Sequence, residues 1–279
     1  MDKLKKEPSG RKAISPEQRL AITLRYLATR ESVKSMAFLF RVGFETARRI
    51  ILETCNALWD ILQPVYMPEP TRTLWERSAE GYANRWQFPN CIGAVDGSVA
   101  DYGSHSDGGV FKNCPIGQAL ENGRLDIPPP QLLAATAITL PCVFVGDEAF
   151  QLRPNFMRPY PAASLNRTRR IFNDRLSRAR RCIENAFGIL ASRWRIFRRP
   201  ICLHPDNAIK VVQACVVLHN YLLTEEDPTD TGSYCPSGSA DMTAGSGQTI
   251  EGQWRTESRN NPPRALATMH RSSARNFCR

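Results

Sequence analysis

Residues 91–111 read CIGAVDGSVADYGSHSDGGVF, and the apolar run at their start decides the fold class. Residues 91–95 are continuously apolar, which is typical of a strand that is buried on both faces of a sheet. This run ends at Asp96. A second apolar run, residues 142–145, ends in the same way at Gly146 and Asp147. Two buried strands among long helical segments predict an α/β fold that is rich in helix.

The N-terminal part is predicted to be helical. Ser15 followed by Pro16 is typical of a capped helix start, and the helix is expected to continue to Arg30. A second short helix over residues 32–40 and a long helix over residues 45–63 follow, and the long helix is expected to end before Pro64.

This order of helices, with a glycine-containing turn before the long one, matches a helix-turn-helix unit. Arg48 and Arg49 lie at the start of the third helix, where base edges and phosphates would be met. A three-helix packing unit that does not bind DNA explains the pattern equally well. Arg48 and Arg49 are therefore candidate DNA contacts.

Composition divides the chain further. Beyond residue 224 polar and glycine-rich sequence replaces the apolar periodicity, so this tail is predicted to be disordered. The expected organisation is a disordered segment (1–14), a helix-turn-helix-like helical region (15–63), a linker with a helix (64–88), a catalytic-type domain (89–223) and a disordered tail (224–279).

The chain carries a net charge of +10, and most of the excess lies in one segment. Residues 166–199 hold eleven arginines against two acids, Asp174 and Glu184. Such a helix predicts a polyanionic partner, most simply DNA. A solvated helix face or a basic targeting patch are the alternatives.

Several classes of protein are disfavoured. No apolar run is long enough for a membrane span, and the basic N-terminus lacks the apolar core of a secretory signal, so no membrane association is expected. The nine cysteines are scattered without a C-x-x-C pair, and the four histidines are dispersed. This argues against a zinc site and a disulfide framework.

Four acids stand out as candidate metal ligands. Asp96 and Asp147 follow the two buried strands, Asp107 lies in a Ser-Asp-Gly-Gly turn, and Glu184 is the only acid in residues 175–199. Ligands of open α/β sheets gather at the carboxyl ends of strands, where carboxylates converge on hard cations such as Mg²⁺. Two such ions catalyse phosphodiester transfer.

Each acid also has a purely structural explanation. Asp96 and Asp107 both precede glycine and suit turns. Asp147, with Glu148, suits the start of a helix at Ala149. Glu184 is placed to form an i,i+4 ion pair with Arg180.

Five blocks together resemble one known family. FPNCIGAVDGS, YGSHSDGGVFKN, LPCVFVGDEAFQLRPNFMRPYP, FNDRLSRARRCIENAFGILASRWRIF and CVVLHNYL occur in the order seen in the PIF/Harbinger superfamily. Its members are DDE transposases and the domesticated Harbinger-derived nucleases. The resemblance covers about residues 15–223.

The resemblance implies an RNase H-like catalytic core that binds two divalent metal ions, Mg²⁺ or Mn²⁺. The metal-binding and catalytic acids of the family fall on Asp96, Asp107, Asp147 and Glu184, and Glu148 is a weaker candidate. The resemblance also implies a nuclear protein that cuts DNA, with a Myb-like DNA-binding partner that helps nuclear entry. A homo-oligomer and a cytoplasmic pool are further expectations. The arginines expected to hold the phosphate backbone near Glu184 are Arg178, Arg180, Arg181, Arg193 and Arg195.

One departure from the family lies within the opening stretch. Members carry two further strands between the acids at Asp96 and Asp107, whereas residues 97–106 are too few for two strands of about five or six residues each. The seam falls near residues 99–101. A lost element or an exon missing from the gene model both explain it. We expect a core with a truncated sheet, an exposed edge at the first strand and weak or absent catalysis. The alternative function is that of a catalytically inactive DNA-binding protein.

Overall fold

The chain forms two compact units. A computed structural model describes residues 13–96, 111, 114–133, 136–227, 233–244 and 248–260. One unit contains residues 13–68 and 188–260, and the other contains residues 69–187. Helix α7 (Arg167–Arg193) runs through the boundary between them. No described helix has both the length and the apolar character to cross a membrane.

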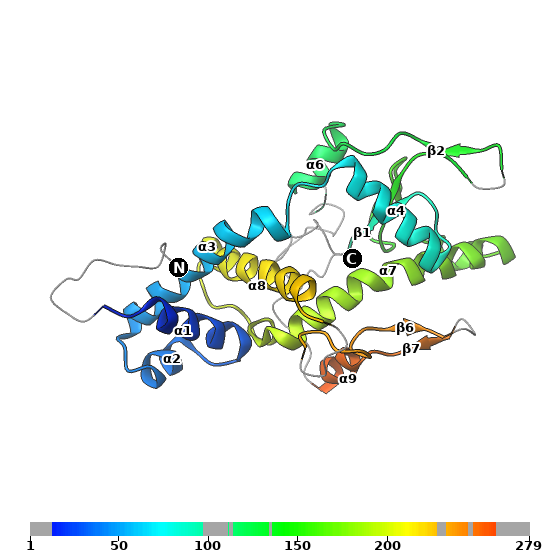
Figure 1. The fold of residues 1–279 in the computed structure, drawn as a ribbon. Helices are drawn as coiled ribbons and strands as arrows, with labels where there is room; N and C mark the ends of the chain where they lie inside the picture. Colours follow the sequence, from blue (N-terminus) through cyan, green and yellow to red (C-terminus); the bar gives the residue numbers. More distant parts are fainter. Residues whose placement is uncertain are drawn as a thin grey trace. The chain divides into compact units, whose positions relative to one another are not determined.

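The first unit is mainly helical (Figure 1). It is built from α1 (Pro16–Ala28), α2 (Val33–Leu39), α3 (Phe44–Tyr66), the 3₁₀ helix η3 (Arg195–Arg198) and α8 (Pro205–Glu225). The side chain of Ser15 accepts a hydrogen bond from the Gln18 N–H, and Ser32 accepts one from the Ser35 N–H. These N-caps confirm the predicted starts of the first two helices.

Helix α3 continues past Pro64, so its predicted end at residue 63 is wrong. Proline lies in the last turn, where its missing N–H costs one bond, and the Met67 N–H still bonds to the Gln63 carbonyl at 2.9 Å. Contacts with α8 hold this end in place. The Asn220 amide donates to the Tyr66 carbonyl at 3.1 Å, and the rings of Tyr66 and Tyr221 meet edge to face at 5.1 Å. Tertiary packing therefore extends the helix.

The core of this unit lies between α3 and α8. Ile50, Ile51 and Cys55 of α3 are buried, as are Val211 and Cys215 of α8. Burial raises the pKa of the Cys55 thiol to about 12, so it stays protonated and acts as a small apolar group. The two helices lie side by side in the ribbon (Figure 1).

The segment after α8 differs from the predicted disordered tail over residues 233–244 and 248–260. It forms β6 (Met242–Thr243), β7 (Thr249–Ile250) and α9 (Gln253–Asn260). Tyr234 is buried and its hydroxyl lies 2.8 Å from Nδ1 of His219. Trp254 packs so closely on Gly188 that a Cβ there would meet its ring. Two aromatic anchors thus order a segment whose average composition is typical of disorder.

The second unit contains a small parallel sheet. Its helices are α4 (Arg72–Trp86), α6 (Pro115–Glu121), the 3₁₀ helix η2 (Ala162–Ser164) and the first part of α7. Strands β1 (Cys91–Ala94), β4 (Val143–Val145) and β5 (Phe156–Met157) pair in the order β1-β4-β5, all parallel. A two-residue hairpin pairs β2 (Gln131–Leu132) with β3 (Thr139–Leu140). The predicted helix-rich α/β class is confirmed.

Aromatic side chains pack under the sheet. Phe150 and Phe156 stack with ring centroids 5.0 Å apart, and Trp75 meets Phe144 edge to face at 5.7 Å. Gly146 follows β4 directly above this cluster. A Cβ at Gly146 would lie 2.7 Å from Phe156 and 2.8 Å from Phe150. Only glycine fits there, because any larger residue would clash with the two rings where the backbone passes them after β4.

We predict that Gly146→Ala destabilises the protein by about 1–3 kcal/mol, the usual cost of overpacking a core. Gly81→Ala is the matched control, because a Cβ there meets nothing within 4 Å and alanine is the better helix former. Urea denaturation followed by circular dichroism measures both. A Gly146→Ala protein with a midpoint at or above that of the wild type would contradict the packing described.

Candidate active site

Two of the predicted acids follow neighbouring strands at the same end of the sheet. Strands β1 and β4 are parallel neighbours with Ala94 opposite Val145, and the Val95 N–H bonds to the Val145 carbonyl at 2.8 Å. Asp96 follows immediately after the first strand, and Asp147 follows Gly146 after the second. The parallel register therefore places both carboxylates at the carboxyl ends of adjacent strands, where α/β proteins bind their ligands.

Asn90 positions β1, and the sequence analysis missed it. Its backbone adopts a positive φ of 59°, and its side-chain amide donates to the Leu140 carbonyl at 3.0 Å. Its own carbonyl accepts from the Val143 N–H at 2.8 Å, which extends the ladder between β1 and β4. An asparagine directly before an apolar run was the available signal, because asparagine tolerates the left-handed conformation better than most residues.

Arg180 of α7 connects Asp96 with Glu184. Its Nη2 lies 3.4 Å from Oδ1 of Asp96 and 4.0 Å from Oε1 of Glu184. The side chains of Arg180, Asp96 and Glu184 are only 18%, 22% and 32% exposed. The predicted i,i+4 pair of Arg180 with Glu184 is present, and the same guanidinium also reaches the end of β1. Two acids far apart in sequence thus share one cation.

The Asp147 carboxylate has a structural role in its loop. Its Oδ1 accepts a hydrogen bond from the Ala149 N–H at 3.0 Å. Asp147 thus caps a backbone N–H at Ala149, as its structural explanation expects. The residues after it form a turn rather than a helix. Glu148 is exposed, and its backbone carbonyl, not its carboxylate, accepts from Arg158. Asp147 has a second oxygen for other partners.

The donor chemistry of this site fits a divalent metal ion. Carboxylate oxygens are the ligands that Mg²⁺ and Mn²⁺ prefer, and Asp96 and Glu184 already face one positive charge. Among the residues that the structure describes, no group of three or more His, Cys, Asp or Glu side chains is placed to hold a metal. Asp107, the fourth predicted ligand, lies outside the described residues. The described residues therefore fit a divalent ion in two respects: their donors are carboxylate oxygens, and Asp96 and Glu184 lie near the same cation.

The predicted DNA-binding arginines divide into several groups. Arg178 pairs with Asp174 at 3.0 Å and is 17% exposed, and Arg180 pairs with the two acids above. Arg193 donates to the Ser233 carbonyl and lies over the Tyr234 ring. Arg195 is exposed and Arg181 is half-buried. Arg193 and Arg195 belong to the helical unit, whereas the other three belong to the unit of the sheet.

Other arginines of α7 are better exposed, and the sequence analysis did not select them. Arg167, Arg170 and Arg175 lie on the solvent side, and none of them pairs with an acid in the part of the chain that the structure describes. The helical period of the sequence already indicated which arginines would be exposed. Positions 172, 176 and 179 form the apolar stripe, so arginines away from that stripe were the ones to expect in water.

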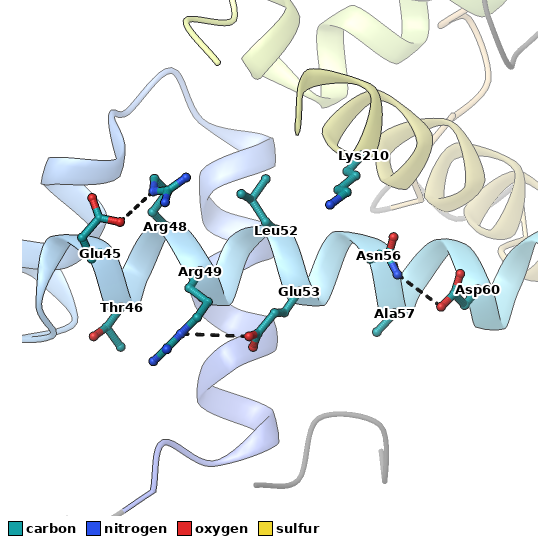
Figure 2. Close-up of a pocket in the computed structure, with 10 residues that line it drawn as sticks. All are labelled: Glu45, Thr46, Arg48, Arg49, Leu52, Glu53, Asn56, Ala57, Asp60 and Lys210. Carbon is teal, nitrogen blue, oxygen red and sulfur yellow. Dashed lines mark hydrogen bonds and ion pairs between the residues drawn. The ribbon is translucent and has the colours of Figure 1, made fainter. Parts of the chain in front are cut away.

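Arg48 and Arg49 line a groove along α3 (Figure 2). Arg48 pairs with Glu45 at 2.9 Å, and Arg49 lies 4.0 Å from Glu53. The groove has a volume of about 740 Å³ and is also lined by Asp60 of α3 and by Lys210 of α8. The lining thus contains three acidic and three basic side chains, and Glu53 also pairs with Arg19 of α1. Since exposed ion pairs of this kind contribute only about 0.3–0.5 kcal/mol, the arginines can exchange partners.

Comparison with known proteins shows what part of the chain resembles. Residues 93–220 match the family described as DDE superfamily endonuclease. This region runs from β1 to α8 and contains all four predicted acids. The chain is thus similar, over this region, to the class of protein that its strand-end acids suggest.

A particular relative can also be named. The protein described as "Protein ALP1-like" from Arabidopsis thaliana is 25% identical over 170 residues, which cover 58% of this chain. The aligned part is 40% of the length of that relative, so the chain spans less than half of it. No solved structure matches the chain significantly.

We predict that Asp96→Asn destabilises the metal-free protein by about 1–2 kcal/mol, because it removes a charged partner of the largely buried Arg180. Asp147→Asn is the control and should change stability by less than about 0.5 kcal/mol, since an asparagine Oδ1 still accepts from the Ala149 N–H. Urea denaturation in the presence of a chelator measures both. A stabilising effect of Asp96→Asn would mean that repulsion between acids outweighs the contact with Arg180.

Proposed function

We propose that this protein is a transposase-derived endonuclease of the DDE type, which cleaves phosphodiester bonds of DNA with divalent metal ions. The observation that carries the proposal is the placement of Asp96 and Asp147 at the ends of adjacent parallel strands, with Glu184 joined to Asp96 through Arg180. The match of residues 93–220 to DDE superfamily endonucleases supports it.

In this proposal Asp96, Asp107, Asp147 and Glu184 hold Mg²⁺ or Mn²⁺. Bound divalent ions supply an activated water or 3′-hydroxyl and stabilise the leaving oxygen. The carboxylates orient the site, and the arginines of α7 hold the phosphate backbone beside it. Glu184 is suited to this role because it lies on the basic helix next to the buried Ile183.

Several finer parts of the proposal rest on the resemblance to the PIF/Harbinger superfamily. They are an RNase H-like core that lacks two strands, DNA recognition by α1–α3, a nuclear location, a Myb-like partner and a homo-oligomer. The position of β1 supports the shortened sheet, because β1 lies at an edge of the three-stranded sheet among the described residues. In α1–α3, the short α2 and the turn at Gly43 precede the long α3, which supports a helix-turn-helix.

We predict that the protein nicks supercoiled DNA in Mn²⁺ or Mg²⁺ and that Glu184→Gln lowers the rate by about 100-fold or more, as loss of a group that organises transition-state charge does. Asp174→Asn is the matched control on the same helix, because in the part of the chain that the structure describes this exposed acid forms its ion pair with Arg178. Agarose gels and chelation measure the effect. Cleavage that survives Glu184→Gln would contradict the role of Glu184.

A second candidate is a DNA-binding protein without nuclease activity. It is favoured by the position of β1 at an edge of the three-stranded sheet among the described residues, where the family carries further strands. Such a protein would bind DNA through the exposed arginines of α7, and its binding would not change on chelation or in Glu184→Gln. Folded protein that binds DNA but does not cleave it in either metal ion would select this candidate.

Both candidates make the same prediction for the basic helix. Replacing Arg167, Arg170 and Arg175 by glutamine should lower the slope of log K against log salt by about 2–3, since each lost phosphate contact contributes about 0.9. Replacing Arg72, Arg153 and Arg259 is the control, because each of these arginines lies outside α7 and already pairs with an acid. Fluorescence anisotropy titrations at several salt concentrations measure the slopes. Equal slopes for the wild type and the first variant would exclude this face.

A further inference from the structure

Arg180 occupies the place between two of the acids that the proposed site assigns to metal ions. Its Nη2 lies 3.4 Å from Asp96 and 4.0 Å from Glu184. These acids come from different elements, the end of β1 and the middle of α7. A guanidinium on α7 is therefore the cation that connects this helix with the strand end in the structure.

The burial of the group makes the contact stronger than an ordinary surface ion pair. All three side chains are less than one third exposed, so water screens their charges only in part. The Nε atom of Arg180 is buried and has no hydrogen-bond partner among the described residues. The guanidinium contacts the two carboxylates through Nη2, so a cation that binds these carboxylates competes with Arg180 for them.

Arg178 provides a direct contrast on the same helix. It is buried to the same degree, with 17% of its side chain exposed against 18% for Arg180. It pairs with Asp174 at 3.0 Å and reaches Gln87, and neither partner is a candidate metal ligand. Burial and charge are thus matched between the two arginines, while only Arg180 contacts the strand-end acid.

We propose that Arg180 is a resident counter-cation, which holds Asp96 and Glu184 in the metal-free protein and competes with divalent ions for them. This inference rests on the proposed metal site. A divalent cation on Asp96 and a guanidinium beside it repel each other, so the guanidinium leaves as metal binds. Once released it lies on the basic helix, where it can contact a DNA phosphate. Arg180 would thus couple metal loading to DNA binding.

The test measures Mn²⁺ affinity by isothermal titration calorimetry and by electron paramagnetic resonance of free Mn²⁺, without DNA. Arg180→Gln should bind Mn²⁺ about three- to tenfold more tightly than the wild type, since it removes a competitor of modest strength. Arg178→Gln should bind as the wild type does. Arg180→Lys keeps the charge, so its affinity should lie between those of the wild type and Arg180→Gln.

A second readout separates this effect from a simple loss of structure. In chelator, Arg180→Gln should unfold at a lower temperature than Arg178→Gln, whereas Mn²⁺ should raise its unfolding temperature more than it raises that of the wild type. Arg180→Met keeps the apolar stem and replaces Arg180→Gln if that variant does not fold. Equal or weaker Mn²⁺ binding by a folded Arg180 variant would overturn the proposal, as would an absence of Mn²⁺ binding by all variants.

DNA cleavage, measured in parallel on the same samples, keeps the two proposals apart. Tighter Mn²⁺ binding by Arg180→Gln with no cleavage by any variant supports the role of Arg180 and contradicts the nuclease. Cleavage that depends on Glu184, together with Mn²⁺ affinity that is unchanged in Arg180→Gln, supports the nuclease and contradicts the counter-cation.

Discussion

The parallel pairing of β1 with β4 is the constraint on which the candidate site depends. The bond from the Val95 N–H to the Val145 carbonyl closes the ladder at the residue before Asp96. A shift of this register by one residue would move Asp96 by about 3.3 Å along the strand relative to Asp147, and would turn its side chain to the other face of the sheet. The two acids would then lie farther apart. Gly93 permits the pairing, because a Cβ there would lie 3.0 Å from the Phe144 ring.

Helix α7 supplies the positive charge beside the carboxyl end of β1. Leu176, Ala179 and Ile183 are buried and fix the rotation of the helix. That rotation carries Arg180 to Asp96 and leaves Arg167 and Arg175 in water. One amphipathic helix therefore presents two kinds of arginine. Those beside the buried stripe compensate carboxylates, and those opposite it remain available to a polyanion.

Much of the fold followed from local patterns. The buried strands, the serine N-caps and the long helices were predicted because each depends on a few neighbouring residues. The predictions that were wrong depended on distant contacts. Pro64 stays helical because α8 packs on that turn, and Tyr234 and Trp254 anchor residues 233–244 and 248–260 within the same unit. Composition averaged over a tail does not show two anchoring aromatic side chains.

The candidate site divides in the same way. The sequence by itself determined which residues carry the chemistry, namely strand-end acids and an arginine-rich helix, because strand ends and helical periods are local properties. Only the tertiary structure decided which charges meet. Asp96 and Arg180 are 84 positions apart, and nothing in either local sequence predicts their contact. Strand pairing and the burial of α7 bring them together, since apolar packing fixes the elements first and the charged side chains reach whatever partners that packing leaves near them.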